Sequence, residues 1–285
     1  MGTGLRRIAA MLFALSACTA ASVTAQNCPV SCVGPPRGAI LAAGGGELPT
    51  SIYREFVQLA GGTEARIVLI PTAGARYGSH DGWTAIEELK KAGVEHLEIL
   101  HTRSASVADL EAFAAPLREA TGVWFSGGRQ FRLVDVYLGT HTHEALHEVL
   151  DRGGIIGGNS AGASALASFL VRGSEDVGEL FTPGKDVGFG FVRDVAIDQH
   201  LIARGRENDM IDILKQHPDL LGIGLDETSA ILITRDLAEV VHGRVAIYDV
   251  TDPLSLIPLR WLGTGDVYDL EARRTVVSGG SPGGT

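Results

Sequence analysis

Apolar runs alternate with helix-like patterns from residue 37 onward. Five runs are wholly or mostly apolar and have strand length; they lie at residues 38–43, 66–70, 97–100, 122–125 and 153–157. Between them, apolar residues recur at helical spacing in residues 51–60, 83–92, 107–120 and 143–151. Strands that are apolar throughout are buried on both faces, which is typical of a parallel sheet covered by helices. The pattern therefore predicts an α/β fold with a mostly parallel central sheet.

The second half of the chain continues this pattern with shorter elements. Small residues at 163–170 predict a helix, and residues 195–198 and 221–225 predict two more strands. Residues 230–233 and 239–248 are typical of antiparallel strands near a sheet edge. We expect a single domain over residues 38–275, preceded by a lead-in at 27–37 and followed by a disordered Ser/Gly/Pro-rich tail at 276–285.

Residues 158–162 have the sequence Gly-Asn-Ser-Ala-Gly and follow the fifth apolar run. Gly-x-Ser-x-Gly between a strand and a helix is typical of a nucleophile elbow, a turn so sharp that its neighbours must be small. Ser160 is therefore the candidate nucleophile. The alternative interpretation is a Gly-rich turn in which Ser160 only caps the next helix.

The first 26 residues have the pattern of a secretory signal peptide. Arg6 and Arg7 precede a short apolar core, and small residues lead to Ala25. The core is too short for a permanent membrane span. Residues 15–18 (Leu-Ser-Ala-Cys) also resemble a bacterial lipobox with Cys18 as the lipidated residue. We expect export to the periplasm or beyond, either released or anchored through Cys18.

The composition narrows the function classes. The 285 residues are 45% hydrophobic and 20% charged, with a net charge of -10. No Lys/Arg stripe with interleaved aromatics is present, so nucleic-acid binding is not expected. Cys28 and Cys32 are the only cysteines besides Cys18, and their spacing suits a local disulfide in an oxidising compartment. No further ligands cluster near them for a metal, and no cofactor is indicated.

A serine nucleophile needs a base, and His200 is the strongest of the nine histidines because it follows an apolar strand beyond the elbow. Glu175 and Asp176 could orient the imidazole, although exposed loop charges are the simpler interpretation. The N–H groups of Ala161 and of the Gly127-Gly128 turn are candidates for an oxyanion hole.

Several spaced motifs together resemble the cyanophycinase / peptidase E family of serine peptidases. They are Phe-Ser-Gly-Gly-Arg-Gln at 125–130, Gly-Gly-Asn-Ser-Ala-Gly-Ala at 157–163, Asp-Gln-His at 198–200, Arg-Gly-Arg at 204–206 and Gly-Leu-Asp-Glu at 224–227. The resemblance covers residues 38–248. It implies a flavodoxin-like, class I glutamine amidotransferase-like α/β/α sandwich. It also implies cleavage of aspartyl peptides by serine, histidine and an acidic residue; cyanophycinases cut β-aspartyl-arginine units.

Carried over by position, the resemblance gives a role to each motif residue. Ser160 is the expected nucleophile, His200 the base and Glu175 the orienting acid, with Asp176 in reserve. Gly128 and Ala161 are the expected oxyanion hole. The expected substrate-binding residues are Gln130, Asp198, Gln199, Arg204 and Arg206. Two arginines that flank a glycine suit a substrate carboxylate.

The chain departs from the family pattern in its charges. Arg129 stands where cyanophycinases typically have an acid, and residues 207–209 (Glu-Asn-Asp) stand where they tend to have a further base. These changes would weaken binding of an acidic backbone or admit the guanidinium of a substrate arginine. Asp226 and Glu227 follow a strand, and we interpret them as structural residues that order a loop.

Three alternatives remain open at this stage. An α-aspartyl dipeptidase would use the same residues, and a non-catalytic binding protein would retain the fold only. An ordinary esterase would use Asp226 and His242, which are 16 residues apart. The sequence also leaves open the choice between a monomer and a homodimer.

Overall fold

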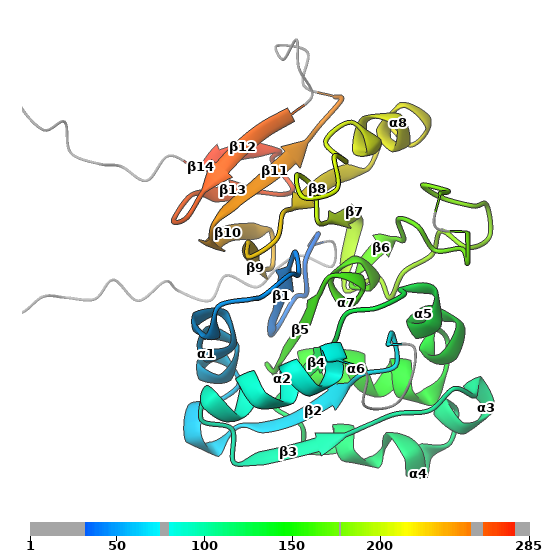
Figure 1. Ribbon diagram of the computed structural model, residues 1–285, viewed down its shortest axis with the longest axis vertical. Helices are drawn as coiled ribbons and strands as arrows, with labels where there is room; N and C mark the ends of the chain where they lie inside the picture. Colours follow the sequence, from blue (N-terminus) through cyan, green and yellow to red (C-terminus); the bar gives the residue numbers. More distant parts are fainter. Residues whose placement is uncertain (1–31, 75–79, 177, 252–258, 277–285) are drawn as a thin grey trace, which may run out of the picture.

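The structure is a computed structural model that describes residues 32–74, 80–176, 178–251 and 259–276 (Figure 1). The five predicted strands are present within about two residues of their expected ends. They are β1 (Ala39–Ala43), β2 (Arg66–Ile70), β3 (His96–Ile99), β4 (Gly122–Phe125) and β5 (Ile155–Asn159). All neighbours among them pair in parallel, in the order β1-β5-β4-β2-β3. The predicted α/β fold with a mostly parallel central sheet is confirmed.

Helices cover both faces of this sheet. One face carries α1 (Thr50–Leu59) and α2 (His80–Lys91); the other carries α3 (Ala105–Ala108), α4 (Glu111–Ala114), α5 (Phe131–Tyr137) and α6 (His141–Asp151). Successive strand residues point to opposite faces. Leu41 and Trp124 therefore pack with Phe56 of α1, whereas Ile40 and Phe125 pack with Leu146 of α6. The unbroken apolar runs of the sequence come from this double coverage.

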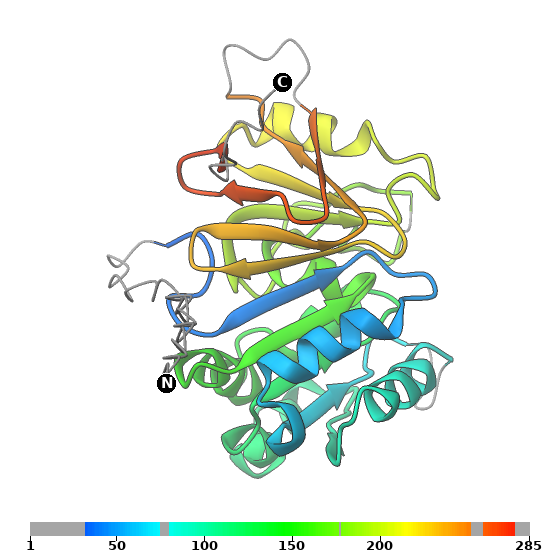
Figure 2. The ribbon, with the colours of Figure 1, turned by 90° about the vertical axis from the view of Figure 1, so that its left-hand side faces the viewer.

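Antiparallel strands extend the sheet beyond β1. They are β9 (Ala230–Thr234), β10 (Leu237–His242), β13 (Val267–Asp269) and β14 (Arg274–Val276). The extension makes a nine-stranded sheet in the described part of the chain. Figure 2 shows the β9–β10 hairpin beside β1. The predicted antiparallel strand at 230–233 lies at this place.

The remaining strands form a second sheet. It contains β6 (Ala167–Phe169), β7 (Val192–Gln199), β8 (Leu221–Leu225), β11 (Arg244–Tyr248) and β12 (Leu259–Gly263), in the order β12-β11-β8-β7-β6. Helix α7 (Ala161–Ala165) packs on both β5 and β7 and so lies between the two sheets. Helix α8 (Asp209–Gln216) covers the outer face of the second sheet through Met210, Ile213 and Leu214.

Three sequence predictions about elements were wrong. The helix expected at 107–120 is broken at Leu110, which is extended, and again after Ala114, where a short 3₁₀ helix, η2 (Ala115–Arg118), contains Pro116 as its second residue. Pro116 has no N–H to donate to the carbonyl four residues back, so a regular α-helix does not run through it. The carboxylate of Asp109 accepts the main-chain N–H of His141 at 3.1 Å, which fixes the first break.

The other two errors concern strands. The helix expected at 163–170 ends at Ala165, because the residues from Ala167 pair in parallel with β7. Main-chain pairing here outweighs the helix preference of small residues. The strand expected at 239–248 divides at Gly243, whose φ of 71° turns the chain from β10 in the first sheet to β11 in the second.

The lead-in segment is attached to the domain. Cys32 is buried and disulfide-bonded. Its partner lies outside the described residues, because the chain's other cysteines are Cys18 and Cys28. The predicted signal peptide, the lipobox and the tail from residue 277 also lie outside them. No helix among the described residues has the length and apolarity required to span a membrane.

Candidate active site

Three polar residues from three strands meet at one edge of the two sheets. Ser160 follows β5, His200 follows β7 and Glu227 comes two residues after β8. All three lie beyond the carboxyl ends of parallel strands, which is where open α/β sheets form their sites. The fold thus brings together residues that are 40 and 27 positions apart in the chain.

The turn at Ser160 has the sharp geometry that the sequence predicts. Ser160 has φ 54° and ψ −118°, and its N–H donates to the carbonyl of Ala43 at 2.9 Å. A Cβ at Gly158 would lie 2.7 Å from the carbonyl carbon of Gly162. A Cβ at Gly162 would lie 2.3 Å from the carbonyl oxygen of Phe125. Both glycines are therefore required sterically to hold Ser160 at the tip of the turn.

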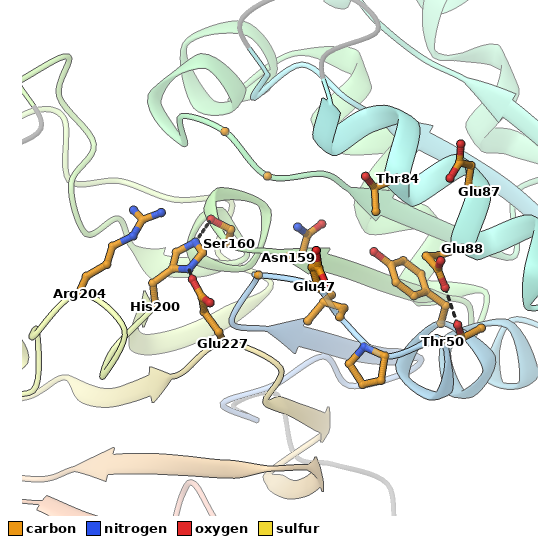
Figure 3. Close-up of a pocket in the computed structure, with 16 residues that line it drawn as sticks. Glu47, Thr50, Thr84, Glu87, Glu88, Asn159, Ser160, His200, Arg204 and Glu227 are labelled. Carbon is orange, nitrogen blue, oxygen red and sulfur yellow. Dashed lines mark hydrogen bonds and ion pairs between the residues drawn. The ribbon is translucent and has the colours of Figure 1, made fainter.

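A chain of hydrogen bonds links Ser160, His200 and Glu227 (Figure 3). Ser160 Oγ lies 2.8 Å from His200 Nε2, and His200 Nδ1 lies 2.7 Å from Glu227 Oε1. The carboxylate fixes the tautomer in which Nδ1 carries the proton and Nε2 can accept one. This arrangement allows the serine hydroxyl to lose its proton to the imidazole as it attacks.

Burial lowers the pKa of His200 below its ordinary value of 6.5. The hydrogen bond to Glu227 acts in the opposite direction and raises the pKa, while the nearby charges of Arg204 and Arg206 lower it. The side chain of His200 is only 8% exposed, so burial is the largest of these effects. The imidazole is therefore neutral at pH 7, as a general base requires.

The structure places Glu227, not Glu175, beside His200. Glu175 and Asp176 are exposed, and the carboxylate of Asp176 accepts the N–H of Gly178 within its own loop. In the described chain, neither is hydrogen-bonded to His200, whose Nδ1 is occupied by Glu227. The interpretation of Glu227 as a structural residue was wrong, and the expectation for Glu175 is corrected accordingly.

A signal for Glu227 was present in the sequence. Residues 221–225 were predicted as a strand, and Glu227 comes two residues after it. In the structure β8 pairs in parallel with β7, so the residues after both strands meet at one edge. Asp226 has a different position: its carboxylate accepts main-chain N–H groups of the turn after His200. His242 binds the carbonyl of Thr228 through Nδ1, so the Asp226–His242 pair of the esterase alternative is not assembled.

Of the two expected oxyanion-hole residues, Ala161 follows Ser160 in the chain and Gly128 lines the same pocket. Ala161 is the first residue of α7, so its N–H has no acceptor within the helix. Gly128 lines the same pocket as Ser160 and has φ 143°; a Cβ there would lie 2.2 Å from the carbonyl oxygen of Ala73. A glycine is thus required where this turn passes the main chain of Ala73.

The expected substrate-binding residues separate into two groups. Arg204 lines the pocket, but the other four are held in the protein interior. Gln130 is buried and donates through Nε2 to the carbonyl of Val171 at 2.7 Å. Arg206 donates to the carbonyl of Gln199 at 3.0 Å and lies 3.5 Å from Asp198. The two arginines of the Arg-Gly-Arg motif therefore have different surroundings: Arg204 lines the pocket, whereas Arg206 contacts buried Asp198.

Arg172 completes this buried group of charges. It lies 3.5 Å from Asp198 and donates to Asp209, the first residue of α8. Burial raises the pKa of Asp198, and Arg172 and Arg206 oppose that rise. Asp209, one of the departures from the family pattern, is therefore an internal partner of Arg172. Arg129, the other departure, is exposed.

The pocket at Ser160 has a volume of about 800 Å³, and basic and acidic residues line different sides of it. Figure 3 shows Arg204 on one side of the Ser160–His200 pair, and glutamates on the other. These glutamates are Glu47 from the loop after β1, and Glu87 and Glu88 from α2. In the described chain, no three His, Cys, Asp or Glu residues are grouped so as to hold a metal ion.

The sequence pattern of peptidase family S51 matches residues 40–241, which include Ser160, His200 and Glu227. The chain belongs to peptidase family S51. It is therefore a serine peptidase, and the resemblance carried by the sequence motifs is confirmed.

Curated relatives of this S51 peptidase are cyanophycinases. The cyanophycinase of Synechococcus elongatus is 31% identical over 261 residues, covering 84% of this chain and 81% of the relative. The cyanophycinase of Trichormus variabilis (strain ATCC 29413 / PCC 7937) is 33% identical over 226 residues, covering 75% and 74%.

Solved structures support the fold. The crystal structure of a peptidase from an acI-B1 Actinobacterium matches with a TM-score of 0.63 at 23% identity, covering 82% of this chain and 97% of that chain. A putative peptidase E protein from Listeria monocytogenes EGD-e matches with a TM-score of 0.53 at 18% identity, covering 69% and 94%.

Proposed function

We propose that this S51 peptidase hydrolyses aspartyl or β-aspartyl peptide bonds through an acyl-enzyme on Ser160. The observation that carries the proposal is the continuous hydrogen-bonded chain from Ser160 Oγ to His200 Nε2 at 2.8 Å and from Nδ1 to Glu227 at 2.7 Å. A serine at a strained strand-to-helix turn with a buried, neutral imidazole is the arrangement that acyl transfer needs.

In the proposed reaction, Ser160 Oγ attacks the carbonyl carbon while His200 Nε2 takes its proton. Glu227 keeps the imidazole oriented and stabilises the imidazolium. The N–H groups of Gly128 and Ala161 donate to the oxyanion of the tetrahedral intermediate. His200 then gives its proton to the leaving amine. A water molecule, which gives a proton to His200, then attacks the ester formed on Ser160. This step releases the acid product and returns the proton to Ser160 Oγ.

The charges around Ser160 favour a substrate with both an acid and a base. Arg204 suits a free carboxylate of the aspartyl residue, since a guanidinium can bind a carboxylate with two hydrogen bonds. Glu47 and Glu87 on the opposite side suit a cationic side chain, whereas Glu88 beside them is already paired with Lys91. A β-aspartyl-arginine unit carries both groups, and the curated relatives are named cyanophycinases. We therefore propose a cyanophycinase-like substrate, without a metal or organic cofactor.

A substrate panel tests this proposal. The purified protein is incubated with cyanophycin, β-aspartyl-arginine and an α-aspartyl dipeptide, with Ser160→Ala as the control. We expect hydrolysis of the β-aspartyl substrates and its loss in Ser160→Ala. Hydrolysis of the α-aspartyl dipeptide alone would favour the peptidase E-like alternative. Undiminished activity of a folded Ser160→Ala variant would exclude the acyl-enzyme.

We also propose that the protein is exported. The basic, apolar and small-residue segments of residues 1–26 support this. Cell fractionation of the full-length chain and of a chain lacking residues 2–26 tests it. We expect the full-length protein in the periplasm or the medium and the shortened one in the cytoplasm. Metabolic labelling with palmitate would distinguish an anchor on Cys18 from a released product.

A further inference from the structure

The turn that carries His200 has an unfavourable main-chain conformation. His200 has φ 54°, in the left-handed region that residues with a side chain rarely adopt. The chain then makes one tight turn, in which the N–H of Arg204 donates to the carbonyl of His200 at 3.0 Å. Such a conformation persists only where surrounding contacts hold it.

Asp226 supplies such contacts. Its Oδ1 accepts the N–H of Ile202 at 2.9 Å and the N–H of Ala203 at 3.0 Å. Hydrogen bonds to a carboxylate are stronger than those between neutral groups. Two consecutive N–H groups of the histidine turn are therefore fixed by one oxygen atom from a different loop.

The same residue is fixed within the loop that carries Glu227. The main-chain carbonyl of Asp226 accepts both the N–H of Ser229 at 3.1 Å and its Oγ at 2.7 Å. The paired residues of β7 and β8 end at Gln199 and Leu225, and one more main-chain bond joins Leu201 to Leu225. Beyond that point, Asp226 connects the two loops that present the imidazole and its carboxylate partner.

We propose that Asp226 is a positioning residue that sets the His200–Glu227 hydrogen bond. The inference rests on the proposed function for its effect on catalysis, but the geometry it concerns is independent of substrate. Asp226 does not line the pocket, so its removal acts through His200. A displacement of about 1 Å at a reacting group can cost on the order of 100-fold in rate.

The test compares Asp226→Ala and Asp226→Asn with wild type in the full chain. The first measurement is the far-downfield NMR resonance of the proton on His200 Nδ1, assigned by its loss in Glu227→Gln. The second is the rate at which a fluorophosphonate modifies Ser160. We expect the resonance to shift or disappear in Asp226→Ala and the labelling rate to fall by about 10- to 100-fold. KM for the hydrolysed substrate should stay within about threefold while kcat falls.

Asp226→Asn retains a neutral oxygen acceptor, so we expect a smaller loss, about three- to tenfold. Ser229→Ala is the matched control, because it removes a bond inside the Glu227 loop but leaves both N–H bonds to Asp226 Oδ1; it should behave as wild type. A folded Asp226→Ala with the wild-type resonance and labelling rate would overturn the inference. If that variant does not fold, Asp226→Asn decides by the same criteria. If wild type is not labelled, the proposed function fails, and the resonance alone decides the positioning role.

Discussion

At the residue scale, Glu227 and Glu175 show why a carboxylate's surroundings decide its role. Both are partly or fully exposed acids in loops, but only Glu227 lies within hydrogen-bond distance of the imidazole. A carboxylate that holds Nδ1–H stabilises the imidazolium formed during the reaction, and one elsewhere on the surface cannot.

Replacement of each acid by its amide gives opposite expected results. In Glu227→Gln the imidazole loses its charged partner, and we expect kcat/KM to fall by about 10²- to 10⁴-fold. Glu175→Gln should stay within about twofold of wild type, because exposed surface charges contribute little. Steady-state hydrolysis of β-aspartyl-arginine measures both. Equal losses in the two variants would contradict the assignment of Glu227.

The dependence of kcat/KM on pH reports the hydrogen bond between His200 and Glu227. Burial lowers the pKa of His200 below 6.5, so the base stays neutral and active to a more acidic pH than an exposed histidine. We expect the acidic limb of kcat/KM for wild type to have its midpoint below 6.5. The hydrogen bond to Glu227 raises this pKa, so the residual activity of Glu227→Gln should have a still lower midpoint. A midpoint above 6.5 in wild type would contradict the direction of the shift.

Arg204 is the arginine of the Arg-Gly-Arg motif that faces the pocket. We expect Arg204→Gln to raise KM for β-aspartyl-arginine by about 10-fold or more, since a charge-assisted contact to a carboxylate is lost. The labelling rate of Ser160 by a neutral phosphonate should change much less. Arg206→Gln, by contrast, should lower thermal stability, because Arg206 is a partner of buried Asp198. If Arg204→Gln lowered the thermal stability and Arg206→Gln did not, the assignment of Arg204 to substrate binding and of Arg206 to stability would be contradicted.

The sequence predicted the serine and the histidine because each follows an apolar strand, a position readable from local pattern. It did not predict Glu227 as the acid, because the position of Glu227 depends on the parallel pairing of β7 with β8. That pairing joins residues far apart in the chain, and local sequence pattern does not reveal it. Nor did the sequence separate Arg204 from Arg206. Their directions depend on Asp198 and on the left-handed turn at Gly205, which local pattern does not reveal.

At the element scale, the loop between β1 and α1 determines how closely serine and histidine approach. Gly45 has φ 110°, and a Cβ there would lie 2.7 Å from His200 Cε1 and 3.0 Å from Ser160 Cβ. The sequence alone gives no role to this glycine-rich turn after residues 38–43. Its steric role depends on neighbours from two other strands.

Gly45→Ala should therefore separate the pair. We expect labelling of Ser160 to fall by about 100-fold. Gly93→Ala is the control: Gly93 has φ 100°, but a Cβ there would meet no atom from elsewhere in the described chain within 4 Å. It should lose about 1 kcal/mol of stability through backbone strain and keep its activity. Full labelling of Gly45→Ala would show that the loop moves aside.

Predictability differed between elements for a physical reason. Strands β1, β2, β4 and β5 are buried over nearly their whole length, and their apolarity marked them well, whereas the edge strand β3 is mostly exposed. Strand β6 has only three residues and follows a helix of small residues, so its pairing with β7 is set by contacts and not by its own pattern. Helix α8 was not predicted, although Met210, Ile213 and Leu214 have helical spacing.

At the scale of the whole molecule, His143 and His147, which pack against aromatic rings, link stability to pH. His143 accepts the N–H of Gly139 through Nδ1 and lies against the carbonyl of Phe189 through Nε2 at 2.9 Å, which requires a neutral ring. Its ring and that of His147 also pack with Phe191. Burial lowers the pKa of both histidines below 6.5.

The sign of the pH effect follows from these shifts. Near and below pH 6.5 the unfolded chain binds more protons than the folded one, so stability is present above this pH and is lost on acidification. We expect a lower melting temperature at pH 5 than at pH 7.5. His143→Gln, which keeps a neutral donor and acceptor, should reduce the difference. A melting temperature that rises on acidification would contradict the lowered pKa values.

The lead-in segment is attached at the end of the strands opposite the pocket. Val33 and Gly34 bind the β9–β10 turn through Asp236 and Arg235, and the carbonyl of Val33 accepts the N–H of Arg193 at the start of β7. These contacts join both sheets at the amino ends of β1 and β7, opposite the edge that carries Ser160. A support or fusion partner coupled at this end would leave the pocket facing away from it, open to a bulky polymer.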